Sequence, residues 1–172
     1  MPGKLLSIYI AKAAGEPMQA IDRAELVSGK GIAGDRYFAG TGEFSPSVQD
    51  PDHEVTLIEI EQIRAFNNTE NAEDAERTSG DDAPTQPLEA SEMRRNLLTE
   101  GIDLNALVGK TFAVGDVLMR GVRLCEPCEV LRDRTRPSIL AGFAHRGGLR
   151  AGIVRGGSIE TGCSLTAEAE KD

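Results

Sequence analysis

The sequence predicts a compact, mainly antiparallel β domain with a few short peripheral helices. Three observations support this prediction. Short apolar stretches recur along the chain, glycine and proline turns separate them (19 Gly and 8 Pro in 172 residues), and there is neither an internal repeat nor a heptad pattern. Because 40% of the residues are hydrophobic, one packed core is feasible. We therefore expect a single domain over 1–172, with its core at about 5–163.

Strands are expected where a short apolar run lies between glycine, proline or polar residues. The Gly115-Asp116 pair predicts a hairpin between two such runs, and Gly156-Gly157 predicts another hairpin between the last two. The glycine-rich stretch 29–36 is expected to be a turn, and 39–52 a loop. The expected strands are 5–12, 24–28, 55–58, 111–114, 117–124, 148–155 and 158–160.

Helices are expected in three places. Ile60, Ile63 and Phe66 have the spacing of one helical face over 59–66. Segments 129–134 and 138–145 are expected to be short helices separated by Pro137. The stretch 97–107 is mixed, with a short turn at 103–107.

Acidic residues are concentrated in one segment. From 59 to 92 there are ten acidic and two basic residues, whereas from 93 to 155 there are eleven basic and six acidic ones. The acidic part at about 67–92 is polar, so we expect a mobile insertion with at most one helical turn, and 164–172 as a tail. The basic part favours an anionic ligand, because nearby charges outweigh distant, screened ones. Arginines that only decorate strand edges are the alternative.

Composition excludes several classes of protein. The net charge of −9, the 4% aromatic content and the absence of Trp argue against a nucleic-acid partner. No apolar run approaches the roughly 18 residues of a membrane span, so no membrane association is expected. The N-terminus does not resemble a signal peptide, and the three cysteines are too few for a disulfide scaffold. We therefore expect a cytoplasmic protein with reduced thiols.

Cys125 and Cys128 form a C-x-P-C pair after a predicted strand. A redox dithiol would require a βαβ context, and a zinc site with His145 and Cys163 lacks the usual second ligand pair. A thiolate nucleophile or soft-metal ligand is the third interpretation, supported if nearby arginines converge on it. Simple packing of buried cysteines is the fourth. The nearby arginines are Arg123, Arg132 and Arg134.

Three polar motifs are ambiguous on their own. The segment GIAGDR at 31–36 lacks the phosphate-loop and dinucleotide-loop patterns and indicates only a sharp turn or a close backbone approach. Arg94-Arg95-Asn96 suits phosphate or carboxylate oxygens, or a salt bridge to the acidic segment. His145 is a candidate base or ligand, or a helix-end residue, and Arg146 and Arg150 add positive charge beside it.

Four segments, taken in order and spacing, resemble the MOSC domain, the C-terminal domain of molybdenum cofactor sulfurases. Similar domains occur as small stand-alone bacterial proteins and in the mitochondrial amidoxime-reducing component. The resemblance spans about 5–163, and the segments HRGGLRA at 145–151 and GGSI at 156–159 extend it. The four segments are GIAGDR at 31–36, Arg95-Asn96-Leu97 with GIDL at 101–104, LVGKTFAVGD at 107–116, and Cys125-Glu126-Pro127-Cys128.

The resemblance implies a MOSC-type β-barrel-like fold and binding of the molybdenum cofactor (molybdopterin), in which a pterin dithiolene and a phosphate accompany the metal. It implies that Cys128 is the catalytic residue and the metal ligand, which agrees with the preference of soft metals for thiolates. Cations and backbone N–H groups suit the phosphate. The expected cofactor-binding residues are Gly34, Asp35, Arg36, Arg95, Asn96, His145, Arg146 and Arg150.

Two functions follow from the resemblance. The first is reduction of N-hydroxylated substrates with electrons from a separate reductase, because the chain shows no flavin, haem or iron–sulfur motif. The alternative is a non-catalytic carrier that uses Cys128 to deliver sulfur or cofactor to partner enzymes, with a cysteine desulfurase as a separate chain. A small zinc or redox module is the third hypothesis. Tyr37 stands where many family members have His, and Cys163 where many have an acidic residue.

Overall fold

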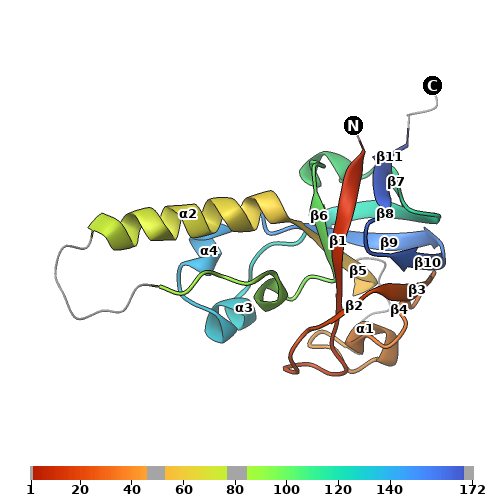
Figure 1. Ribbon diagram of the computed structural model, residues 1–172. Helices are drawn as coiled ribbons and strands as arrows, with labels where there is room; N and C mark the ends of the chain where they lie inside the picture. Colours follow the sequence, from red (N-terminus) through yellow and green to blue (C-terminus); the bar gives the residue numbers. More distant parts are fainter. Residues whose placement is uncertain (1, 46–52, 77–84, 169–172) are drawn as a thin grey trace.

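Seven strands close into a β-barrel, in a computed structural model that describes residues 2–45, 53–76 and 85–168. The order around the barrel is β11–β7–β8–β9–β5–β6–β1, and β1 pairs with β11 to complete the ring. Only the β5–β6 pair is parallel among these described strands. The predicted mainly β, barrel-like fold is therefore confirmed (Figure 1). The strands are β1 (Gly3–Ile10), β5 (Val55–Glu59), β6 (Leu97–Glu100), β7 (Thr111–Val114), β8 (Val117–Leu124), β9 (Leu149–Arg155) and β11 (Ser164–Ala167).

The interior of the barrel is the main hydrophobic core. Alternate residues of each strand point inward, so that Phe112, Met119 and Leu165 are fully buried at the centre of their strands. Burial of each such side chain stabilises the fold by roughly 1.5–3 kcal/mol relative to exposure. Because apolar side chains fill this interior, the polar site residues are expected around its outside and its ends.

A small second sheet packs against the barrel, and it shows that the hairpin predicted around Gly156-Gly157 is wrong. β10 (Gly157–Glu160) pairs with β3 (Arg23–Val27), which pairs with β4 (Gly31–Ile32), rather than folding back on β9. A Cβ atom on Gly156 would lie 2.4 Å from the carbonyl oxygen of Leu26. Glycine at 156 therefore lets the chain cross closely over β3 and continue into that sheet. A further short strand, β2 (Gln19–Ile21), pairs with β1.

The longest described helix lies between the two parallel strands of the barrel along the chain. α2 (Ile60–Glu76) follows β5 and extends away from the barrel, with α3 (Glu129–Arg134) and α4 (Ile139–Gly142) beneath it (Figure 1). Ile63 and Phe66 are its buried residues, and the Phe66 ring lies 4.8 Å from that of Phe143. A second hydrophobic cluster, on the outside of the barrel, results from this packing. No helix of the described residues is long and apolar enough to cross a membrane.

The two ends of the expected acidic insertion contain secondary structure beyond the single helical turn that was predicted. The helix does not stop at 66 but continues through ten further residues, to Glu76. After 77–84, which lie outside the described residues, the Asn67 side chain exchanges two hydrogen bonds with the Leu88 backbone, at 2.8 and 3.0 Å. The chain then forms the short 3-10 helix η2 (Ala90–Met93).

Short elements were also missed elsewhere. Residues 164–167, expected to belong to a tail, form the closing strand β11. The mixed stretch after 97 contains β6 as well as the 3-10 helix η3 (Asn105–Leu107). The short helix α1 (Arg36–Ala39) lies at the junction of the expected turn and loop.

Candidate functional site

A cleft with an empty volume of about 600 Å³, open to solvent, is lined by residues of α1 and α3, among others. Its walls include five arginines, two cysteines and three aromatic rings, against two carboxylates, Glu43 and Glu126. The cleft is therefore strongly cationic although the whole chain is acidic. The arginines are Arg36, Arg94, Arg95, Arg134 and Arg150.

The two cysteines of the C-x-P-C pair have different environments. Cys125 is 1% exposed, and its backbone N–H donates to Gly148 O at 2.7 Å. Cys128 is exposed and lies at the N-cap of α3, in the wall of the cleft. A Cβ on Gly147 would lie 2.6 Å from Cys125 O, so the loop packs directly on that glycine. The Cys128 thiol is therefore accessible to a ligand, whereas the Cys125 thiol is buried in the wall of the cleft.

Arg95 holds the cysteine loop in place. Its side chain is 8% exposed, and each of its three nitrogen atoms donates to a backbone carbonyl. Nε donates to Gly147 O at 2.9 Å, Nη1 to Met93 O at 3.0 Å, and Nη2 to Cys125 O at 3.0 Å. Arg95 therefore fixes the positions of three loops around the cleft, in addition to contributing charge.

Arg94, which sequence reasoning did not place among the cofactor-binding residues, has the most unusual environment. Its backbone is in the left-handed region, with φ 58°, which a non-glycine residue rarely adopts. Nη1 donates to Glu16 O at 2.7 Å, whereas Nη2 is buried without a hydrogen-bond partner among the described residues. Burial and then the like charges of Arg36 and Arg134 lower the pKa of Arg94.

The GIAGDR segment contributes one residue to the cleft. Asp35 is fully buried, and its carboxylate accepts from Ala11 N and from Arg36 Nη1, both at 3.1 Å. It also caps α1 by accepting from Tyr37 N at 3.4 Å. Gly34, at φ 87°, makes the turn. These two residues shape the loop, and only Arg36, whose Nη2 donates to Arg94 O at 3.3 Å, lines the cleft.

Three aromatic rings and two guanidinium groups form one wall. The Tyr37 and His53 rings are 5.8 Å apart with a 10° interplanar angle, and His53 and Phe44 are 6.1 Å apart at 12°. Arg36 lies 4.8 Å from the Tyr37 ring centroid, and Arg150 lies 6.0 Å from that of Phe44. Such stacks contribute about 0.5–1.5 kcal/mol per aromatic pair. Nothing in the spacing along the sequence indicated this wall.

The remaining expected cofactor-binding residues, Asn96, His145 and Arg146, do not line the cleft. The Asn96 side chain is 2% exposed, and it accepts from Thr56 N and Oγ1 at 3.1 Å and donates to Tyr9 O at 3.1 Å. His145, at φ 61°, is exposed, and its backbone N–H donates to Glu126 at 2.9 Å. Arg146 Nε donates to Gly142 O at 2.7 Å, at the end of α4. Their contacts connect backbone segments, and none of the three lines the cleft.

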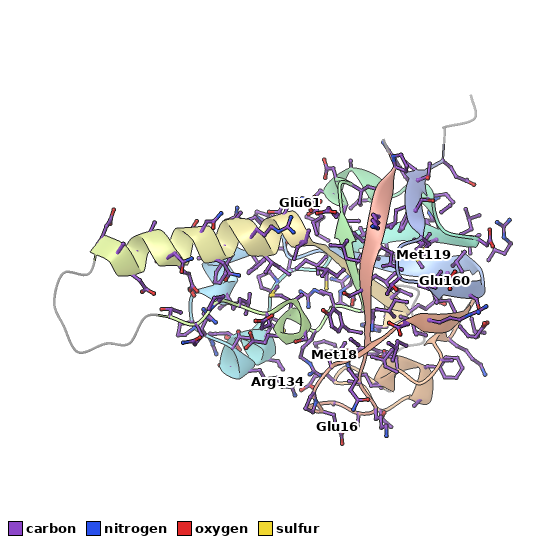
Figure 2. All side chains as sticks on the ribbon, in the orientation of Figure 1. Glu16, Met18, Glu61, Met119, Arg134 and Glu160 are labelled. Carbon is purple, nitrogen blue, oxygen red and sulfur yellow. The ribbon has the colours of Figure 1, made fainter. Side chains whose placement is uncertain are left out.

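A second hollow adjoins the cleft and shares Arg94 and Arg134 with it. Figure 2 shows Glu16, Met18 and Arg134 at the same end of the molecule, although they come from the loop after β1 and from α3. Arg134, one of the three arginines expected near the cysteine pair, also forms an ion pair with Glu43 at 3.0 Å. The loop after α1 is thereby connected to α3 at the rim.

The zinc and redox hypotheses gain no support. Within the described ranges, no group of three or more His, Cys, Asp or Glu side chains is placed to hold a metal ion. Cys163 lies beside Gly115, and burial raises the pKa of its thiol. The C-x-P-C pair follows β8, not the first strand of the β5–α2–β6 unit.

Comparison with known proteins identifies the family. The MOSC domain family model matches residues 47–168. The YuaD protein of Bacillus subtilis has a similar structure, with a TM-score of 0.70 and 17% identity over 99% of this chain and 98% of that one. YiiM of Geobacillus stearothermophilus has a TM-score of 0.69 and 13% identity over 98% and 76%. A search of curated proteins finds no significant match. The chain therefore belongs to the MOSC domain family.

Proposed function

We propose that this chain binds the molybdenum cofactor in the cleft and reduces N-hydroxylated substrates with electrons from a separate reductase. Cys128 serves as the metal ligand. One observation carries the proposal: an exposed thiol lies in the wall of a cleft that contains five arginines. Family membership, which is associated with this cofactor, adds to it.

The residues present fit the cofactor. A thiolate is a soft ligand, suited to a metal already bound by the two sulfur atoms of a dithiolene. A phosphate group would find the buried Nη2 of Arg94 and the Arg36 and Arg134 guanidinium groups nearby, and charge-assisted hydrogen bonds to phosphate are strong. No set of three or more protein ligands is needed, because the pterin supplies the other sulfur ligands.

The residues of this chain position the reactants. Arg95 holds the loop that bears Cys128 through its bonds to Cys125 O and Gly147 O. When bound, the cofactor supplies the two-electron chemistry. The N–O bond of the substrate breaks, the electron pair from the reductase ends on nitrogen, and two protons complete an amine and a water molecule. The aromatic wall excludes solvent from one side of this reaction.

The proposal is tested by expressing the chain in a host that makes the cofactor. We expect about one molybdenum per chain, pterin fluorescence, and reduction of an N-hydroxylated substrate with a chemical electron donor. Cys128→Ala should abolish turnover, because the metal loses its protein ligand. Cys163→Ala is the matched control and should keep wild-type activity, since that thiol lies beside Gly115 at another part of the barrel. Full activity of Cys128→Ala would contradict the proposal.

A carrier function is the second candidate, favoured by the exposure of the Cys128 thiol at the surface of the molecule. A partner's persulfide could transfer its outer sulfur to such a thiolate, and the partner would leave as a thiolate. Incubation with a cysteine desulfurase and cysteine, followed by mass spectrometry, tests this. Cofactor binding or a persulfide on Cys128 without substrate reduction would favour the carrier over the enzyme.

A further inference from the structure

The phenol of Tyr37 is a chemically active group that the proposed function has not yet used. Tyr37 lines the cleft, and its backbone N–H donates to Asp35. Across residues 2–45, 53–76 and 85–168, no group forms a hydrogen bond with its hydroxyl. The phenolic oxygen is not among the fully buried atoms without a partner, so it retains some contact with solvent, and the residue that carries it lines the cleft. A tyrosine hydroxyl in a mostly enclosed place usually finds a partner. Here that partner can be a ligand.

The ring of Tyr37 is held on several sides. Arg36 lies 4.8 Å from its centroid, and the His53 ring lies 5.8 Å away and nearly parallel. A Cβ atom on Gly42 would lie 2.6 Å from Cε1 of the ring, so the ring packs directly on that glycine. A hydroxyl on a ring fixed in this way has one position in the cleft, which is the requirement for a group that acts on a reacting atom.

The surroundings keep this phenol protonated. Burial raises the pKa of Tyr37 above its ordinary value of 10.0, and the positive charges of Arg36 and Arg150 only partly oppose the effect. Asp35, at the start of α1, and Cys125, after β8, also raise it, and the His53 imidazole faces the ring from before β5. At neutral pH the group is therefore a donor. If it loses its proton to a strong base, the two guanidinium groups stabilise the phenolate.

We propose that Tyr37 is a catalytic residue that donates a hydrogen bond, and then its proton, to the hydroxyl oxygen leaving the substrate nitrogen. This inference rests on the proposed reduction of N-hydroxylated compounds. The N–O bond breaks, the oxygen leaves with the bonding pair and takes the phenol proton to become water. The nitrogen takes the electron pair from the reductase and a proton from solvent, and water then reprotonates the phenolate. Hydroxide is a far stronger base than phenolate, so the transfer is favourable.

Removal of the hydroxyl alone tests the proposal. In the cofactor-loaded protein, Tyr37→Phe should lower kcat about 100-fold, the usual size of a general-acid contribution, with KM and molybdenum content unchanged. The fall in wild-type kcat at high pH, where the phenol ionises, should be absent from the variant. Tyr9→Phe is the matched control, because Tyr9 is the other of the two tyrosines in the chain. Gly42→Ala should also lower kcat, since the added methyl group displaces the ring but leaves the hydroxyl.

A second measurement needs no cofactor and no turnover. The chain has no tryptophan, so the ultraviolet phenolate band of Tyr9→Phe reports the titration of Tyr37 alone. We expect its midpoint above 10.0, and a return toward that ordinary value in the double variant with Gly42→Ala. A phenol that is already ionised at neutral pH would overturn the proposal, because it could not donate a proton to the leaving oxygen.

The kinetic outcomes separate this inference from the function on which it rests. Wild-type kcat and pH profile in Tyr37→Phe, combined with an inactive Cys128→Ala, would overturn the role of Tyr37 and leave the proposed reduction standing. Loss of molybdenum from Tyr37→Phe would also overturn it, because the residue would then hold the cofactor. A wild-type protein that binds no molybdenum and reduces no N-hydroxylated compound would defeat both proposals together.

Discussion

Arg94 and Arg95 are adjacent residues with opposite surroundings. All three side-chain nitrogen atoms of Arg95 donate to backbone carbonyls, so this guanidinium group stabilises the positions of the loops that it joins. Arg94 has a left-handed backbone, two cationic neighbours and a buried Nη2 that finds no partner in the described part of the chain. Poorly compensated groups of this kind are enriched at binding sites. The proposed function therefore assigns Arg94 to the ligand, whereas Arg95 holds the surrounding backbone in place.

This difference predicts two distinct phenotypes. Arg95→Met should destabilise the protein by about 3 kcal/mol, because three buried carbonyls lose a charged donor. Arg94→Met should change stability by less than about 1 kcal/mol, since loss of one hydrogen bond is offset by relief of repulsion from Arg36 and Arg134. Urea denaturation measures both values.

Cofactor content completes that comparison. Arg94→Met, although folded, should retain less molybdenum than the wild type when both are expressed in the same host. Stability losses of equal size in the two variants, or full molybdenum loading of Arg94→Met, would contradict the assignment of Arg94 to the ligand.

At the scale of elements, local signals predicted some parts of the fold and not others. β7, β8 and α3 have the expected bounds. The Gly115-Asp116 turn separates β7 from β8, and the residues around Pro127 separate β8 from α3. β6 and β11 were missed, because four-residue strands are defined by distant partners rather than by their own composition. The predicted end of α2 was too early, since its acidic second half is anchored by Glu70, which accepts from Arg136 and from Ser138.

The connection between β5 and η3 depends on a buried carboxylate. Glu59, the last residue of β5, is 6% exposed and accepts from Leu104 N at 2.8 Å. Burial raises the pKa of Glu59, and the nearby carboxylates of Asp103 and Glu61 add to the effect. Because its folded pKa lies above the unfolded one, Glu59 contributes stability at low pH that is lost as the pH rises through the folded value.

Glu59→Gln should therefore be more stable than the wild type at neutral pH. The amide oxygen can still accept from Leu104 N, while the cost of a buried charge disappears. The difference between the two proteins should grow as the pH rises from the ordinary glutamate pKa of 4.5 through the raised one, and then level off. Urea denaturation at several pH values checks this, with the exposed Glu76→Gln as control. A variant less stable than the wild type at pH 7 would contradict the prediction.

At the scale of the whole molecule, the cleft is assembled from segments far apart in the sequence. Arg36 and Tyr37 come from α1, Arg94 from before β6, Cys128 from the N-cap of α3 and Arg150 from β9. Seven residues from the motifs that the sequence singled out line the cleft: Arg36, Arg94, Arg95, Cys125, Cys128, Arg134 and Arg150. The left-handed backbone of Arg94 and the stacked ring of Tyr37 were not predicted, because neither has a local sequence pattern. The barrel is the rigid frame that brings these segments together.

Closure of the barrel should accordingly be required for the site to exist. β11 joins β7 to β1, and Leu165 is fully buried in the interior. A chain ending at Cys163 loses this strand, which removes a buried leucine, worth about 3 kcal/mol, and exposes the edges of β1 and β7 to aggregation. A chain ending at Glu168 keeps β11 and the bond from Glu168 N to Thr111 O at 3.1 Å. We expect the shorter chain to lose at least about 10 °C in Tm and to elute as aggregates in gel filtration, whereas the longer one behaves like the full chain. If both chains unfold at the same temperature, the barrel does not depend on its last strand for closure, and the cleft residues must be held in place by the small sheet and the helices instead.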